Sequence, residues 1–137
     1  MANTNAPFGL RWLGFATGSA APTFSLIPAK IKADQTHKFY KGDGVQTLNS
    51  GYVDAVQAAS VAASQWVGVF SSVSYLSTAF GRNFTAPYFP GGDTTTDANA
   101  LLVPLIGSPP QLFVAQVTST ACAFADLGLN VDITYTA

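Results

Sequence analysis

Residues 38–56, KFYKGDGVQTLNSGYVDAV, place two turn signals around one short apolar run. The first, GDG at 42–44, is typical of a hairpin turn, because glycine adopts positive φ without strain and Asp-Gly is a strong hairpin signal. The second is NSG at 49–51, and aromatic and β-branched residues flank both turns. The stretch therefore predicts a meander of short strands, with a catalytic loop as the competing interpretation.

The composition of the whole chain favours strands over helices. Its 137 residues are 48% apolar and only 9% charged, whereas an average soluble domain has about 25% charged residues. All seven acidic residues are aspartates, although helix surfaces usually carry Glu and Lys. Ser, Thr, Gly, Pro and aromatic residues suit strands and turns instead. A chain of this length and apolar content is expected to form one domain with its own core.

Apolar runs outline further strands. WVGVFSSVSYLS at 66–77 is predicted to be a strand. One face of it is predicted to hold Val67, Val69, Ser71, Val73 and Tyr75. ANALLVPLI at 98–106 is predicted to be a strand at a sheet edge or bulge, because Pro104 has no N–H to donate. LFVAQVTS at 112–119 and VDITYT at 131–136 are also predicted strands, and Pro109-Pro110 is predicted to form a stiff bend.

Two segments carry helix signals. DAVQAASVAASQ at 54–65 fits either a short helix beginning at its Asp or a tight loop. Ser119 or Thr120 is a possible cap for a short helix that Gly128 would end. The prediction is an all-β, mainly antiparallel fold with at most one or two short helices: a compact β-sandwich, jelly-roll-like or barrel domain. Residues 1–35 are expected to form an extended N-terminal arm and first strands, and residues 36–137 the β-rich core of this single domain.

Charge and hydropathy argue against several classes of partner. Six scattered Lys and Arg residues and a net charge of −1 supply little that would neutralise nucleic-acid phosphates. No apolar run reaches the 18 or so residues of a membrane span. The N-terminus lacks a charged region followed by an apolar one, so no signal peptide is expected. We therefore expect the protein to fold in a cytoplasm.

The residues that usually carry chemistry form no recognisable site. His37, the only histidine, lies among charged residues and is interpreted as a solvated turn residue. The pairs Asp93/Asp97 and Asp126/Asp132 are interpreted as turn aspartates, and Cys122 as a buried small apolar residue. We therefore expect no enzyme, and no catalytic, cofactor-binding or metal-binding residues. A structural or binding module remains.

Five motifs follow one another along the chain: GDGVQTLNSGYVDA, VGVFSSVSY, APYFPGG, ALLVPLIGSPPQLFVAQV and FADLGLNVDI. Their order and spacing over residues 38–133 resemble the small capsid-decorating, or cement, proteins of tailed bacteriophages. The chain departs from that pattern at Phe89, where a Trp is common, and at Pro110, where an Asp-Pro turn is expected, and residues 1–35 match poorly. The matching positions are Gly42, Asp43, Val45, Gly51, Tyr52, Gly68, Val69, Phe70, Val73, Tyr75, Tyr88, Pro90, Pro109, Phe113, Gln116, Gly128 and Asn130.

The resemblance implies a virion protein made in the host cytoplasm and bound to the outer surface of an icosahedral head. Its partner would be a major capsid protein of the HK97-like fold, and it would sit as a homo-oligomer where capsid subunits meet. A trimer is favoured, because a cyclic oligomer fits a pseudo-threefold position, and a dimer comes next. Aromatic and arginine residues predicted to lie in the arm and in the loop at 81–97 are the expected partner-binding residues. They are Phe8, Arg11, Trp12, Arg82, Tyr88 and Phe89.

A second interpretation is a jelly-roll carbohydrate-binding module on a virion surface or tail. Aromatic loops that also carry Asp and Asn would suit stacking against sugar rings. Binding to glycans and binding to capsids distinguish the two interpretations.

Overall fold

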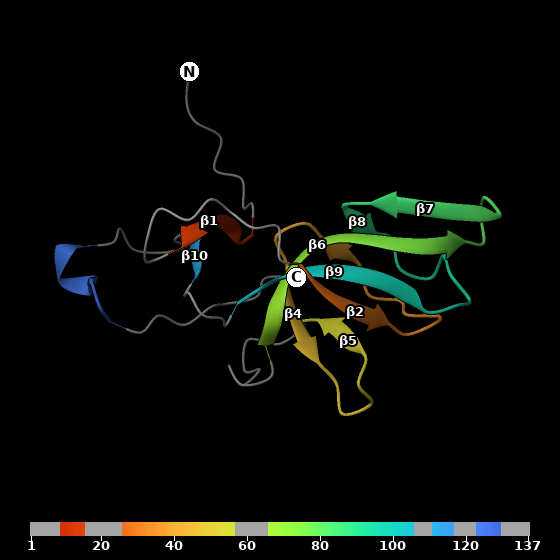
Figure 1. The fold of residues 1–137 in the computed structure, drawn as a ribbon, viewed down its shortest axis with the longest axis horizontal. Helices are drawn as coiled ribbons and strands as arrows, with labels where there is room; N and C mark the ends of the chain where they lie inside the picture. The colour runs from red at the N-terminus through yellow and green to blue at the C-terminus, as the bar shows by residue number, and fades with distance from the viewer. Residues whose placement is uncertain (1–8, 16–25, 57–65, 106–110, 117–122, 130–137) are drawn as a thin grey trace, which may run out of the picture.

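Five strands close into a barrel in the computed structural model, which describes residues 9–15, 26–56, 66–105, 111–116 and 123–129 (Figure 1). The barrel strands are β2 (Ile27–Ile31), β4 (Gly44–Thr47), β5 (Val53–Ala55), β6 (Trp66–Ser77) and β9 (Ala98–Pro104). They pair in the order β4-β5-β2-β9-β6, and β4 also pairs with β6, which closes the ring. All these pairs are antiparallel except β2 with β5. The all-β prediction is confirmed, and the architecture is the barrel.

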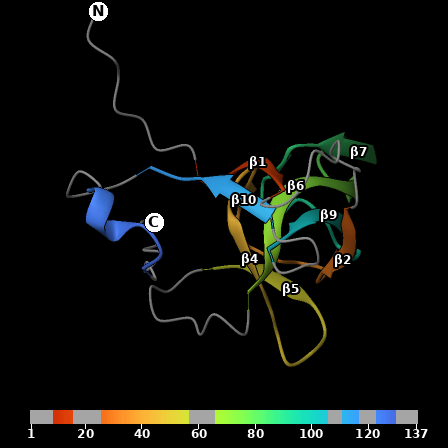
Figure 2. The ribbon, with the colours of Figure 1, turned by 60° about the vertical axis from the view of Figure 1, so that its left-hand side comes forward.

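Within the described ranges, five further strands lie around the barrel. β7 (Arg82–Ala86) extends the sheet beyond β6. The two other pairs are β3 (Phe39–Tyr40) with β8 (Tyr88–Phe89) and β1 (Arg11–Phe15) with β10 (Gln111–Val114). We call the β1–β10 pair the ribbon. The ribbon and a 3₁₀ turn (Phe124–Asp126) lie on the left in Figure 1, and Figure 2 brings that side forward.

Both turn signals at 38–56 form turns. Gly42 has a φ of 100°, and the Asp43 carboxylate accepts a hydrogen bond from the Tyr40 N–H at 2.8 Å. Gly51 has a φ of 84° and donates to the Leu48 carbonyl at 2.9 Å. The second turn joins β4 and β5 as a hairpin. The first does not, because β3 pairs with β8, and the turn instead leads the chain from that pair into the barrel.

A bulge in β6 changes which of its side chains enter the core. Phe70 pairs with Leu102 and Ser72 with Leu101, so Ser71 has no partner in β9 and the alternation of faces reverses there. The predicted bounds of this strand are confirmed. Its predicted common face is wrong, because Phe70 rather than Val69 joins Val73 and Tyr75 in the core. The core cluster consists of Ile31, Phe39, Val45, Val53, Ala55, Phe70, Val73, Tyr75, Phe89, Ala98, Ala100 and Leu102.

The structure corrects several local predictions. β9 is a central strand between β2 and β6 and not an edge strand. Pro104 is its last residue, beyond Leu102, where the pairing with β2 ends. Asp54 begins no helix, because it lies within β5. The helix predicted before Gly128 is reduced to the 3₁₀ turn, although Gly128 does have a positive φ of 83°.

Other predicted elements lie wholly or partly outside the described residues: the segment at 57–65, the Pro109-Pro110 bend, the caps at 119 and 120, Cys122, and the strand at 131–136. The strand predicted at 112–119 is present as β10 at its start. Within the expected arm and first strands at 1–35, β2 is a barrel strand. Among the described residues, no helix has the length and apolar character that crossing a membrane would need.

Candidate interaction surface

The β3–β8 pair has one buried and one exposed face. Phe39 pairs with Phe89, and both rings are fully buried, 5.9 Å apart at 74°. Tyr40 pairs with Tyr88, and these rings stack at the surface, 5.3 Å apart at 27°. Successive residues of a strand point to opposite faces, so the side chains of residues 88 and 89 lie on opposite faces of the pair. The prediction that Phe89 contacts a partner is therefore wrong, because its ring lies in the core.

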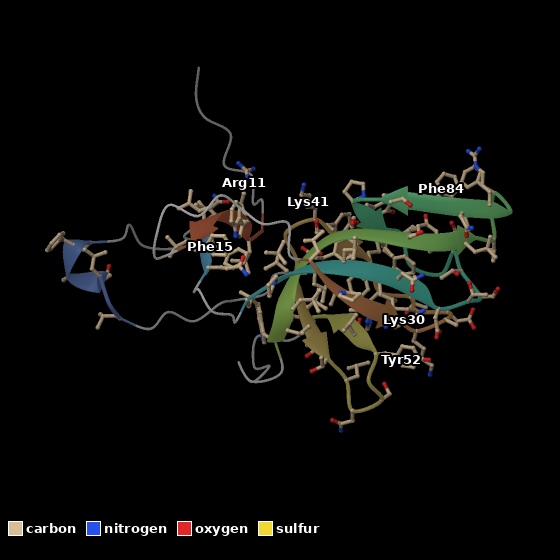
Figure 3. The ribbon with its side chains drawn as sticks, in the orientation of Figure 1. Arg11, Phe15, Lys30, Lys41, Tyr52 and Phe84 are labelled. Carbon is tan, nitrogen blue, oxygen red and sulfur yellow. The ribbon has the colours of Figure 1, made fainter. Side chains whose placement is uncertain are left out.

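Aromatic contacts continue from this pair across β6 and β7. Tyr75 meets Phe89 edge to face at 5.3 Å and stacks on Phe84 at 6.2 Å. Phe84 in turn meets the exposed Phe80 at 5.2 Å. The Arg82 guanidinium lies 4.8 Å above the centre of the Phe84 ring, a cation–π geometry. Phe84 lies on the upper side of the molecule in Figure 3.

We call this row of residues the aromatic strip: Tyr40, Tyr88, Tyr75, Phe84, Phe80 and Arg82. Tyr75 is its most buried member. Its ring contacts Phe84 within the strip and Phe89, the sequence neighbour of Tyr88, in the core. Burial raises the pKa of the Tyr75 hydroxyl, and the negative charge of Asp93 and the nearby Tyr88 raise it further. The hydroxyl of Tyr75 therefore stays neutral, and Arg82 supplies the positive charge of the strip. Arg82 and Tyr88 were predicted as contact residues, and the other four members were not: Tyr40, Tyr75, Phe80 and Phe84.

A pocket of about 390 Å³ lies between the ribbon and the barrel. This volume falls in the range of small-molecule pockets, about 300–1,000 Å³. Within the ribbon, the Trp12 indole N–H donates to the Gln111 side-chain oxygen at 2.8 Å. The Leu10 N–H donates to the Gly42 carbonyl at 2.8 Å, and this bond connects the start of the ribbon to the turn after β3. We call this the ribbon pocket. Its lining residues are Leu10, Arg11, Trp12, Lys41, Gly42, Val69, Phe70, Ser71, Val103 and Phe113.

The charged residues around the ribbon pocket are both cationic. Arg11 and Lys41 belong to its lining, and the described lining residues include no carboxylate. Both lie on the upper side of the molecule in Figure 3, as Phe84 does. The structure thus brings Arg11 and Trp12 together at this pocket and places Arg82 and Tyr88 in the aromatic strip. Phe8, the remaining predicted contact residue, lies outside the described residues.

An imidazole–carboxylate pair was missed by sequence analysis. The His37 Nδ1 lies 2.9 Å from both carboxylate oxygens of Asp54, and one of those oxygens also accepts the Ala55 N–H at 2.8 Å. The His37 ring is half exposed, whereas Asp54 is buried in β5. The pair fastens the loop before β3 to the barrel, and no local signal announces it because the partners are 17 residues apart.

The aspartates considered as pairs in the sequence make separate sets of hydrogen bonds. Asp93 accepts hydrogen bonds from the Ser77 hydroxyl at 2.6 Å and from the Ala79 N–H at 3.0 Å. Asp97 accepts from the Tyr52 hydroxyl at 3.0 Å, and Asp126 from the Ala123 N–H at 2.8 Å. The interpretation as turn residues agrees with these contacts for Asp93 and Asp126. Asp97 instead links segments that are distant in the chain, since it also accepts the Ala33 N–H at 3.0 Å, and Asp132 lies outside the described residues.

No metal-binding cluster accompanies these aspartates in the part of the chain that the structure describes: three or more His, Cys, Asp or Glu side chains do not come together there.

Comparisons with protein-family models, with curated proteins and with solved structures found no match to this chain.

Proposed function

We propose that this protein is a capsid decoration, or cement, protein: a structural virion protein that binds the outer surface of an icosahedral phage head and stabilises the expanded capsid. The order of motifs over residues 38–133 supports the proposal through its resemblance to such proteins. The structural observation that carries it is the aromatic strip, a row of tyrosine and phenylalanine rings with one arginine. Its exposed members are Tyr40, Tyr88, Phe80 and Arg82. The partner would be a major capsid protein of the HK97-like fold.

The chemistry of the aromatic strip suits a protein–protein interface. Interface cores are enriched in Tyr, Phe and Arg and depleted in Lys, Glu and Asp relative to the remaining surface. Tyr and Arg are also over-represented among the few residues that dominate binding energy. Tyr88, Tyr40 and Arg82 are therefore the proposed anchor residues. Each is held in place by a ring contact that restricts it before a partner binds.

Stabilisation of a shell follows from mass action. A protein that binds the expanded lattice but not the compact one shifts the equilibrium toward the expanded state. A homo-oligomer that contacts several capsid subunits gains avidity, because its second contact forms at a high effective concentration. A trimer is the favoured oligomer and a dimer the next.

The test is co-sedimentation of the purified protein with compact procapsids and with expanded heads that lack it. We expect saturable, stoichiometric binding to expanded heads only. Tyr88→Ala and Arg82→Gln should each weaken that binding by at least about tenfold, as loss of an anchor residue does. Leu48→Ala is the matched control for the tyrosine, since Leu48 is 37% exposed and Tyr88 is 39% exposed. Lys30→Gln, in β2, is the control for the loss of a positive charge.

Two results would overturn the proposal. The first is failure of the unmodified protein to bind either shell. The second is binding that both anchor variants leave unchanged, which would remove the aromatic strip as the contact surface.

Carbohydrate binding is a second candidate function, which the stacked pair Tyr40 and Tyr88 favours. Two exposed rings presented side by side suit stacking against the apolar face of a sugar. A glycan array tests this candidate: binding that is lost in Tyr40→Ala would support it. Silence on the array together with binding to heads would exclude it.

A further inference from the structure

The 3₁₀ turn and the residues after it carry an unusual apolar surface. Phe124 is 89% exposed, Leu127 70% and Leu129 65%. A single exposed apolar residue is common, but several together mark a surface that another molecule covers. Figures 1 and 2 both show this turn standing away from the barrel.

The same turn carries a negative charge. Asp126 lies between Phe124 and Leu127, and one of its carboxylate oxygens accepts the Ala123 N–H at 2.8 Å. That hydrogen bond closes the turn and holds the carboxylate in the same short segment as the exposed Phe124 and Leu127 side chains. The segment at 123–129 thus presents apolar side chains and one anionic group within a short length of chain.

The ribbon pocket has the complementary properties. Its walls include Trp12, Phe113 and Val103, and its charged lining residues are Arg11 and Lys41. A volume of about 390 Å³ is large enough for an aromatic side chain and part of its neighbour. An acidic segment that carries a phenylalanine is the kind of partner that these walls and charges fit.

We propose that the segment at 123–129 of one copy docks in the ribbon pocket of a second copy. Phe124 enters between the apolar walls, and Asp126 faces Lys41 and Arg11. The segment of each copy occupies the pocket of the next, so the contact is head-to-tail and a closed ring forms when the rotation per copy completes a circle. The inference rests on the oligomer part of the proposed function and names the surfaces that build the oligomer.

The first measurement is the oligomeric state of the full chain by analytical ultracentrifugation, without capsids. The unmodified protein should self-associate, and Phe124→Ser should raise the dissociation constant by at least about tenfold. Asp126→Asn retains an oxygen for the Ala123 N–H but removes the charge, so it should weaken association several-fold. Lys41→Gln should do the same, and the double variant should lose less than the product of the two single losses, because the two charges act on each other.

Two control variants match these changes. Phe80→Ser removes an exposed phenylalanine from the aromatic strip, and Lys38→Gln removes an exposed lysine outside the ribbon pocket. Both should self-associate like the unmodified protein. A monomeric unmodified protein would overturn the inference, as would equal effects of the control and test variants.

The second measurement maps the contact directly. A photoreactive benzoylphenylalanine replaces Phe124, and equal amounts of ¹⁴N- and ¹⁵N-labelled chains are mixed and irradiated. Cross-links between chains of different isotope, to peptides that carry Trp12, Ser71 or Phe113, are the expected result. Cross-links within one chain only, or to other surfaces, would overturn the inference.

The capsid-binding assay remains separate from both measurements. Binding of a monomeric protein to heads would leave the proposed function standing without this interface. A ring that forms through Phe124 but binds no head would support this interface and overturn the proposed function.

Discussion

Tyr88 and Phe89 illustrate how a single peptide unit separates a surface residue from a core residue. Both were expected at the surface, because they lie in a Pro- and Gly-rich stretch with no alternation visible around them. The pairing with Phe39 and Tyr40 supplies the missing information, since it places one ring of each strand inside and one outside. Sequence analysis could not obtain this pairing, because the two strands are short and distant in the chain.

Asp93 gives a pH-dependent prediction at the same scale. The hydrogen bond from the Ser77 hydroxyl has the largest effect on the Asp93 carboxyl, and it lowers the pKa below the ordinary 3.8. The hydrogen bond from the Ala79 N–H lowers the pKa further. The ionised carboxylate therefore stabilises the folded state above pH 3.8, and this contribution is lost as the pH falls through the lowered pKa. Asp93→Asn should unfold at lower urea than the unmodified protein at pH 7, and the difference should shrink well below pH 3.8.

Urea titrations of both proteins at a series of pH values check this prediction. If the difference in free energy of unfolding between the two proteins stayed constant from neutral to acidic pH, the carboxylate charge would contribute nothing to the turn. If the two proteins differed most in stability at acidic pH, the prediction would be wrong in sign.

Local chemistry was predictable wherever the residues involved are close in sequence. The turns at 42–44 and 49–51 follow from glycine and asparagine or aspartate at fixed positions. His37 and Asp54 show the opposite case, because only the fold brings the imidazole to the buried carboxylate. The loop that holds His37 was read as solvated from its own charges, which contain no sign of a partner in β5.

At the scale of elements, β6 was predictable in its bounds but not in its faces. Its 12 residues are the predicted run from Trp66 to Ser77. The bulge at Ser71 reverses the alternation, and neither residue type nor period marks it beforehand. The position of Pro104 in the sheet was equally hard to predict from its residue type. It lies at the end of a central strand, where one missing N–H is tolerated as it is at an edge.

The close approach of β6 and β9 yields a prediction for Gly68. A Cβ at this position would lie 2.7 Å from the Val103 carbonyl oxygen and 3.1 Å from the Leu102 Cβ, closer than packed atoms allow. Gly68→Ala should therefore lower the free energy of unfolding by about 1–3 kcal/mol, the usual cost of overpacking. Urea denaturation followed by circular dichroism measures this loss.

Gly14→Ala in β1 is the matched control, because a Cβ there would have no atom within 4 Å. Alanine in an open strand position should be neutral or slightly stabilising, since glycine loses more conformational entropy on folding. Equal losses for both variants would show that the close approach at Gly68 has no energetic weight.

At the scale of the whole molecule, closure of the barrel was the feature least accessible to sequence analysis. The all-β class followed from composition and short strands. Closure depends on pairings between distant segments, namely β2 with β9 and β4 with β6, and on the parallel contact between β2 and β5. The aromatic strip depends on two other pairings, β3 with β8 and β6 with β7, and four of its six members were not among the predicted contact residues.

The separation of ribbon and barrel predicts two levels of stability. The described core residues all belong to the barrel or to the β3–β8 pair, whereas the ribbon strands pair only with each other and are partly exposed. Hydrogen exchange should therefore be faster for amides in β1 and β10 than for those in β6 and β9, on the order of tenfold or more. Mass-spectrometric exchange at peptide resolution measures this, and equal protection would show that ribbon and barrel open together.

The position of β6 also determines how the molecule bears a mechanical force. On one side β6 pairs with β4 and then with β7, and on the other side with β9. A pull on Phe84 or Arg82 enters through β7 and runs along β6, so that many interstrand hydrogen bonds perpendicular to the strands resist it in shear at once. A pull on the ribbon meets one short pair of strands. Under a pulling force, the end of the molecule that carries the aromatic strip would therefore hold longer than the end that carries the ribbon.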